Sequence, residues 1–155
     1  MANGNTSFGY LLPTREMVMA PGEPNFASMI DLSVRAEELG FGSVWCGDSV
    51  LARPRLEALS SLATIAGRTK KVKLGTAVFL PALRHPVILA NEVANLDIVS
   101  EGRVILGVGI ASKNPTVEKE FDACGVSFRY RAVSYTHLRA HETEADLVCR
   151  LLLEK

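Results

Sequence analysis

A carboxylate and a hydroxyl stand side by side just after a short apolar run. Asp48 and Ser49 follow the run Ser43–Cys46, whose composition favours a β-strand. A carboxylate in this place can orient a hydrogen-bond donor or act as a general base, and the hydroxyl adds a second polar group. The same pair can also simply cap a turn, because Asp and Ser side chains bond readily to nearby backbone amides. The residues alone leave both interpretations open.

Two glycines at the end of another apolar run suggest a second place for a ligand. Gly107 and Gly109 form a Gly-x-Gly pair, but Ser112 occupies the third glycine position of a dinucleotide fingerprint, and Lys113-Asn114-Pro115 interrupts the expected helix start. A Rossmann site is therefore disfavoured. Because glycine lets the backbone approach a flat ligand closely, the pair suits the floor under a ring. It can equally well ease helix–strand packing.

Histidine and cysteine offer little further chemistry. His85 stands just before a predicted helix, where packing is a commoner role than catalysis. Cys46 and Cys124 have no local histidine or second cysteine that would activate a thiol, so both are predicted to be small buried residues. We therefore assign no catalytic residue.

The last stretch, residues 133–155, differs in origin from the rest. In one reading frame VSYTHLRAHET back-translates to a transposase-type sequencing adapter, and DLVCRLLLEK to the flow-cell end of the same adapter. We interpret this stretch as a non-native tail and residues 1–132 as the native portion. His137 and His141 have a spacing that on a helix suits zinc, but they fall in the tail, so no metal site is predicted.

The native portion predicts alternating strands and helices. Short apolar runs bounded by turn residues are typical of strands buried on both faces: Phe8–Leu12, Ser43–Cys46, Val72–Leu80 and Val104–Ile110. Their starts lie about 30 residues apart, the length of a strand–helix–strand unit, which favours a parallel sheet. The intervals predict helices: one over Phe26–Val34 that stops at Gly40, Arg55–Gly67, one that opens at Pro86 with Leu89, Val93 and Leu96 toward the sheet, and Pro115–Cys124 stopping at Gly125.

Four such units fit two α/β architectures, an open doubly wound sheet or the first half of a (β/α)₈ barrel. In both, ligands bind at the carboxyl ends of the strands, where Asp48, Ser49, Gly109 and Ser112 lie in the sequence. The segment Met19–Pro24, which contains glycine and two prolines, predicts a loop.

The amino-acid composition indicates which kinds of binding partner the protein is expected to have. The chain has 17 basic and 17 acidic residues, and 48% of its residues are hydrophobic. This balance is typical of one soluble domain and gives no electrostatic signature of a nucleic-acid or membrane partner. Three scattered cysteines and no secretory leader favour a reducing, cytoplasmic location.

Three stretches, in this order, resemble the bacterial luciferase-like family of flavin- and deazaflavin-dependent oxidoreductases: FGSVWCGDS, KVKLGTAVFLPALRHPVILANEVANLDIVSEGRVILGVGI and EFDACGVSF. The similarity runs from about Ser7 to Phe128. It implies the N-terminal half, about four βα units, of a (β/α)₈ TIM barrel that binds FMN or coenzyme F420 at the carboxyl ends of its strands. The chain as written would then be truncated.

The resemblance also implies a set of cofactor-binding positions. They are Asp48, Ser49, Thr76, Ala77, Val78, Gly107, Gly109 and Ser112. Relatives often carry a non-prolyl cis peptide bond under the ring, whose equivalent joins Ala77 to Val78. Many relatives have histidine in place of Ser49, and some have glutamate in place of Ser112, and serine cannot replace either as an acid or base near neutral pH. We therefore assign these positions to binding and leave the chemistry unspecified.

The activity that the resemblance implies is that of a flavin-dependent oxidoreductase or monooxygenase. It would use reduced FMN and O₂ on a small organic substrate, with a flavin reductase as partner and a homo-oligomeric state at full length. The alternative is F420-dependent hydride transfer on the same fold, and a non-catalytic flavin-binding relative is a third. Because barrel phosphate sites commonly use loops after the seventh and eighth strands, the chain as written is expected to be inactive.

Overall fold

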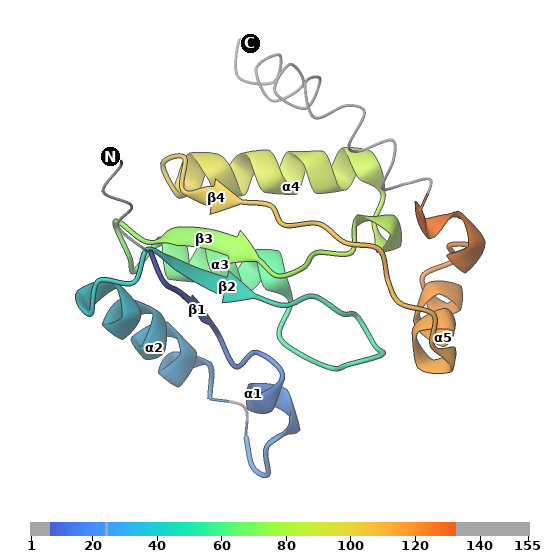
Figure 1. Ribbon diagram of the computed structural model, residues 1–155, viewed down its shortest axis with the longest axis horizontal. Coiled ribbons are helices and arrows are strands. Elements are labelled where there is room, and N and C mark those ends of the chain that lie inside the picture. Colours follow the sequence, from blue (N-terminus) through green and yellow to red (C-terminus); the bar gives the residue numbers. More distant parts are fainter. Residues whose placement is uncertain (1–6, 24, 133–155) are drawn as a thin grey trace, which may run out of the picture.

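The computed structural model describes residues 7–23 and 25–132, so the interpretation of residues 133–155 as a non-native tail lies outside the described residues. Four parallel strands form a single sheet in sequence order (Figure 1). They are β1 (Gly9–Leu11), β2 (Ser43–Cys46), β3 (Lys73–Thr76) and β4 (Val104–Ile105).

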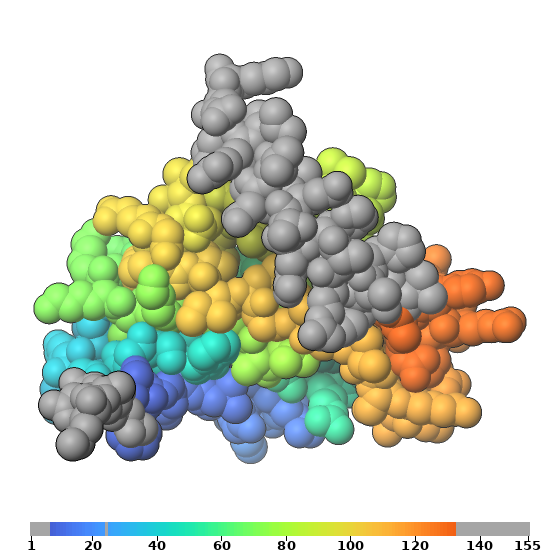
Figure 2. Space-filling model, turned by 45° about the horizontal axis from the view of Figure 1, so that its top comes forward, coloured from blue at the N-terminus to red at the C-terminus, as the bar shows by residue number. Residues whose placement is uncertain are grey.

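Helices connect the strands and occur throughout the described part of the chain. They are α1 (Glu16–Met19), α2 (Phe26–Glu38), α3 (Ala58–Ala66), α4 (Pro86–Val99) and α5 (Pro115–Ala123), with 3₁₀ turns η1 (Pro81–Leu83) and η2 (Phe128–Tyr130). The successive units also follow one another in space, from blue through green to gold (Figure 2). Within the described part, none of the helices is long and apolar enough to cross a membrane.

The register of the sheet separates two faces. Val44 lies between Tyr10 and Leu74, and its side chain is fully buried in the core that α2, α3 and α4 form against the sheet. The next row places Leu11 and Ile105 on the opposite face, because side chains alternate along a strand. Those two side chains are 60% and 39% exposed, so one face of the sheet is covered by helices and the other is open.

This arrangement distinguishes the two architectures that the sequence left open. A doubly wound sheet has helices on both faces and a reversal of strand order at a switch point. Here α3 lies behind the sheet with no described helix in front of it, and the strand order is sequential (Figure 1). The described residues therefore form part of a (β/α)₈ barrel, as predicted, with the open face in the place of the barrel interior.

The helix ends have local causes. The Asn25 side chain accepts a hydrogen bond from the amide of Ser28 at the start of α2, and Gly40 adopts a positive φ of 83° just after its end. Pro86 opens α4 as predicted, and the side chains of Leu89 and Leu96 are buried in the main core.

Several boundaries differ from the sequence predictions. The third and fourth strands end at Thr76 and Ile105 rather than at Leu80 and Ile110. Helix α3 begins at Ala58 and not at Arg55, because Glu57 is its N-cap: the carboxylate accepts hydrogen bonds from the amides of Leu59 and Ser60. Glutamate is not among the preferred N-cap residues, which is why the sequence did not predict this start. The sequence also gave no sign of α1, η1 or η2.

Candidate functional site

One surface of the candidate site forms where β3 and β4 end. The peptide bond between Ala77 and Val78 is cis, which confirms the prediction. Phe79 then rejoins the sheet: its amide donates to the carbonyl of Gly107 at 2.7 Å, and its carbonyl accepts from the amide of Gly109 at 2.9 Å. Ala77 and Val78 are both exposed, and Val78 is 46% exposed.

Close contacts with neighbouring residues leave no room for a side chain at Gly107 or at Gly109. A Cβ atom on Gly109 would lie 2.6 Å from Cγ2 of Val78, and one on Gly107 would overlap the carbonyl oxygen of Thr76. The Thr76 hydroxyl donates a hydrogen bond to the Gly107 carbonyl at 2.9 Å. The structure thus brings together five of the predicted binding residues, which we call the floor: Thr76, Ala77, Val78, Gly107 and Gly109.

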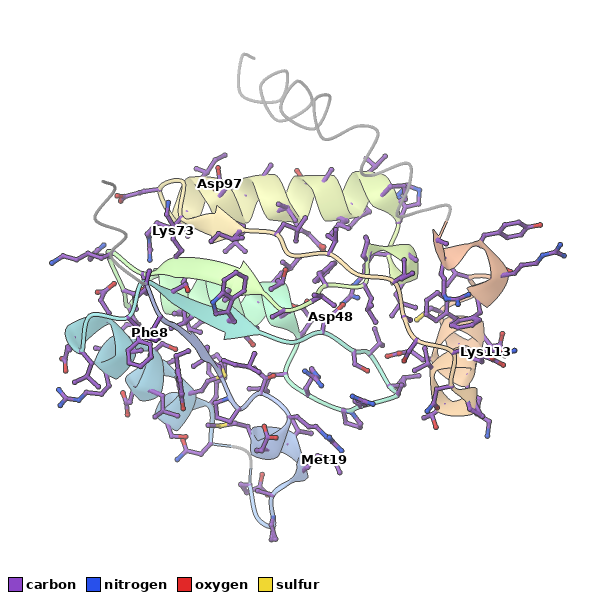
Figure 3. The ribbon with its side chains drawn as sticks, viewed as in Figure 1. Phe8, Met19, Asp48, Lys73, Asp97 and Lys113 are labelled. Carbon is purple, nitrogen blue, oxygen red and sulfur yellow. The ribbon has the colours of Figure 1, made fainter. Side chains whose placement is uncertain are left out.

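Asp48 lies beside the floor, at the end of the sheet that faces α5 and far from Lys73 (Figure 3). Its carboxylate is buried and accepts hydrogen bonds from the amide of Leu80 at 2.9 Å and from the two terminal nitrogens of Arg84 at 2.5 and 2.6 Å. The Arg84 guanidinium also stacks on the ring of Phe79, 4.2 Å from its centroid. Both carboxylate oxygens therefore accept hydrogen bonds, and Asp48 connects the end of β2 to the segment that follows β3, at Leu80 and Arg84.

The hydroxyl of Ser49 is engaged from two sides. It donates to Oε1 of Glu120 at 2.8 Å and accepts from the amide of Arg53 at 2.9 Å. The same Oε1 accepts from the amides of Val50, Leu51 and Ala52. Glu120, in α5, therefore holds the loop that follows β2.

Glu120 is a residue of the candidate site that the sequence analysis missed, as are Arg84 and Glu57. Its side chain is 1% exposed, and its Oε2 atom is buried with no hydrogen-bond partner among the described residues. Burial raises the pKa of this carboxyl group, but the hydrogen bonds from the loop amides and from Ser49 outweigh burial and hold the pKa below its usual value. The group is thus a carboxylate near neutral pH. Its partners lie about 70 positions away in the chain, so no local pattern could have revealed it.

Ser112 is the predicted binding residue that the structure does not join to the others. It is exposed, in the segment between Gly109 and α5, and no hydrogen bond links it to another described residue. The region also lacks an activated thiol, because burial raises the pKa of Cys46 to about 12, with the nearby Glu57 charge raising it further and Arg55 opposing. In the described ranges, no cluster of three or more His, Cys, Asp or Glu residues could hold a metal ion.

The chemistry of the floor follows from these contacts. It offers backbone and small or apolar side chains to a ligand, since Val78 and the nearby Ile110 are 46% and 52% exposed. Such a surface suits a flat ring. Asp48 and Ser49 beside it are engaged with protein partners, so the described contacts favour binding and orientation over acid–base catalysis.

Comparisons with known proteins agree with this geometry. The family described as luciferase-like monooxygenase matches residues 6–134. The F420-dependent glucose-6-phosphate dehydrogenase of Amycolatopsis mediterranei is 42% identical over 88 residues, which is 52% of this chain and 26% of that protein. The enzyme of the same name from Kineococcus radiotolerans is 35% identical over 127 residues, covering 77% of this chain and 34% of the relative.

A solved structure supports the fold over nearly the whole chain. The monooxygenase RslO1 from Streptomyces bottropensis aligns with a TM-score of 0.66 and 30% sequence identity, covering 94% of this chain and 42% of that one. The chain thus spans between about a quarter and two fifths of the length of these proteins. It belongs to the luciferase-like monooxygenase family of flavin- and F420-dependent oxidoreductases, and its four strand–helix units match part of that family's barrel.

Proposed function

We propose that the full-length protein is an F420-dependent oxidoreductase that transfers a hydride between the deazaflavin and a small organic substrate. The observation that carries this proposal is the similarity to F420-dependent glucose-6-phosphate dehydrogenases, at 42% and 35% identity. The sequence analysis placed FMN first and F420 second. The curated relatives favour the reverse order.

The floor provides an open, apolar surface of the kind that a flavin or deazaflavin ring requires. Gly109 leaves open the space that a Cβ atom would fill against Val78, and Ala77 and Val78 present exposed backbone and apolar side chains. These residues would lie under the ring of a bound flavin or deazaflavin. The Thr76 hydroxyl stabilises the surface through its hydrogen bond to the Gly107 carbonyl. When bound, F420 supplies the hydride-transfer chemistry, and the protein supplies binding, orientation and exclusion of water.

Asp48 and Ser49 support that site by holding it in shape. Asp48 fixes the segment after the floor through Arg84, and Ser49 fixes the loop after β2 through Glu120. Since neither has an unengaged acid or base function in the described contacts, we propose that both act through positioning. The group that handles the substrate proton is then supplied by another part of the full-length protein.

A second candidate function is an FMN-dependent monooxygenase, acting with O₂ and a flavin reductase. It is favoured by the 30% identity to RslO1 over 94% of this chain. A third candidate, a non-catalytic flavin-binding relative, is favoured only by the serines at positions 49 and 112.

Cofactor retention by the full-length protein separates the F420 and FMN candidates, and turnover with an added reductase and a substrate panel separates both from the non-catalytic relative. The reading frame is first obtained by sequencing the source locus past the codon of Arg131 with unrelated adapters, and we expect it to continue into further strand–helix units. The purified protein is then incubated with equal amounts of F420 and FMN and passed through a desalting column. Retained F420 supports the proposal, whereas retained FMN without F420 supports the monooxygenase.

We further propose that the full-length protein is a homo-oligomer in the cytoplasm. Helix α4 carries exposed aliphatic side chains at both ends: Val87, Ile88, Ile98 and Val99, which are 68%, 56%, 54% and 60% exposed. Exposed aliphatic side chains that gather on one element often mark a surface covered by a partner subunit. Light scattering should give more than one protomer for the wild type and a lower mass for a variant with Ile88→Asp and Ile98→Asp. A monomeric wild type would contradict the proposal.

A further inference from the structure

Two arginines near the floor differ in how their charge is compensated. Arg84 forms a bidentate pair with Asp48 and approaches Glu57 at 3.9 Å. Arg55 makes one long hydrogen bond, from Nε to the carbonyl of Arg53 at 3.4 Å. Within the described part of the chain, Arg55 has no carboxylate partner, and neither of its terminal nitrogens donates a hydrogen bond.

The guanidinium of Arg55 lies on the backbone of Gly47, at the carboxyl end of β2. A Cβ atom on Gly47 would overlap Nη1 of Arg55 and would lie 3.1 Å from its Cζ atom. The same Cβ position is 3.6 Å from the carbonyl oxygen of Ala77, the first exposed residue of the floor. The cation is therefore placed beside the floor, and glycine at position 47 is what makes room for it.

The loop that carries Arg55 is held at both ends by described contacts. Glu120 accepts hydrogen bonds from the three consecutive amides of residues 50–52. After Arg55, the amide of Leu56 donates to the carbonyl of Thr14 at 3.2 Å, and Glu57 caps α3. The position of Arg55 beside Gly47 is thus set by contacts from α5, from the turn after β1 and from the start of α3.

The acids that surround this loop are already engaged. Asp48 binds Arg84, Glu57 accepts from the amides and hydroxyl of α3, and Glu120 accepts from the loop amides. None of the three carboxylates is within ion-pair distance of Arg55. The positive charge at the edge of the floor therefore has no counter-charge in the described part.

We propose that Arg55 binds an oxyanion, a carboxylate or a phosphate, of the ligand that occupies the floor. A guanidinium presents parallel N–H donors that match both groups in a bidentate manner, and it keeps its charge at any physiological pH. The oxyanion belongs either to the substrate or to the cofactor, and the chemistry of recognition is the same for both. The proposal rests on the proposed function only in taking the floor as a ligand site.

The test uses the full-length protein and compares Arg55→Gln with Arg53→Gln. Both variants remove one positive charge from the same loop, but Arg53 is exposed and does not lie on Gly47. Calorimetric titration with inorganic phosphate should show affinity weakened by about ten- to a hundredfold in Arg55→Gln and nearly unchanged in Arg53→Gln, since charge-assisted hydrogen bonds are lost only in the first. Arg55→Lys should fall between them, because it keeps the charge and loses the bidentate geometry.

Two further arms identify the source of the oxyanion and guard against misfolding. The cofactor arm uses whichever of F420 and FMN the protein retains: a loss of affinity for it, but not for the deazaflavin or riboflavin that lacks the phosphate, assigns the oxyanion to the cofactor. A loss confined to inorganic phosphate and carboxylate substrates assigns it to the substrate. Gly47→Ala should reproduce the loss without removing any charge, because it displaces the guanidinium. Equal behaviour of Arg55→Gln and Arg53→Gln in every arm would overturn the proposal, whether or not F420 is the cofactor.

Discussion

Replacing Glu120 by alanine should destabilise the protein strongly, because one buried carboxylate oxygen serves four donors. Oε1 accepts from the Ser49 hydroxyl at 2.8 Å, from the Leu51 amide at 2.8 Å, and from the amides of Val50 and Ala52. Each donor left without a partner costs about 1 kcal/mol at the low end, because these groups are partly buried. Since all four share one oxygen the costs are not additive, and we expect about 3 kcal/mol in total.

Glu120→Gln is the matched control for this prediction. The amide oxygen of glutamine can take the place of Oε1 and keep the four donors paired, so only the charge is lost. Charge-assisted hydrogen bonds are about twice as strong as neutral ones, which predicts a loss of about 1–2 kcal/mol. The free energies of unfolding are measured by urea titration of the full-length protein with circular dichroism. A Glu120→Ala variant within about 0.5 kcal/mol of the wild type, the range of ordinary surface changes, would refute the assigned role.

Three further predictions concern the pH dependence of Glu120, the reactivity of the cysteines and the space at Gly109. Because the pKa of Glu120 is held below its usual value, the carboxylate stabilises the fold fully above the unfolded pKa of about 4.3 and loses this effect as pH falls through the folded pKa. The difference in urea midpoint between wild type and Glu120→Gln should therefore shrink between about pH 5 and pH 3, and a constant difference would contradict this. Since the pKa of Cys46 is about 12, only about one thiol in 10⁴ is ionised at pH 8, and a disulfide reagent should label the half-exposed Cys124 before Cys46; equal labelling rates of these two cysteines would be contrary evidence. Gly109→Val should weaken cofactor binding by about tenfold or more, because a Cβ there would lie 2.6 Å from a methyl group of the floor, whereas Gly67→Ala, with an ordinary 3.5 Å contact, should leave binding unchanged. Equal cofactor affinities of the two glycine variants, measured by fluorescence quenching, would count against the floor.

The elements that the sequence predicted well are those with strong local signals. The run Ser43–Cys46 forms β2 with those bounds, and Pro86 and Gly40 mark helix ends as expected from their backbone preferences. The third strand is shorter than its apolar run, because regular pairing stops at Thr76, with the Ala77 amide still donating to the Cys46 carbonyl, and resumes only at Phe79. Hydrophobicity alone does not distinguish residues paired within a strand from apolar residues that follow its end.

The floor could be located from the sequence, but its supports could not. Thr76, Ala77 and Val78 were assigned through the family resemblance, and the structure brings them together with Gly107 and Gly109. The partners of Asp48 and Ser49 depend on contacts between Asp48 and Arg84 and between Ser49 and Glu120, which lie 36 and 71 positions apart in the chain. Such pairings arise from tertiary packing and leave no periodic trace.

At this end of the fold, the residues of the candidate ligand surface differ from the residues that hold it in place. Within the floor, Ala77 and Val78 are exposed and Thr76 is buried, while Asp48, Glu57 and Glu120 each hold a backbone segment in place around it. Asp48 and Glu120 are buried and all three carboxylates are engaged, so the surface should keep its shape without a ligand, which would favour tight and oriented binding.

The central claim, F420-dependent hydride transfer, is tested most directly by following F420 absorbance with the full-length protein under anaerobic conditions. Oxidised F420 is mixed with the enzyme and a panel of small alcohols and sugar phosphates. Substrate-dependent bleaching of the deazaflavin absorbance without O₂ is the predicted result. No bleaching with any substrate, together with O₂-dependent turnover when reduced FMN is supplied, would contradict the claim and establish the monooxygenase alternative.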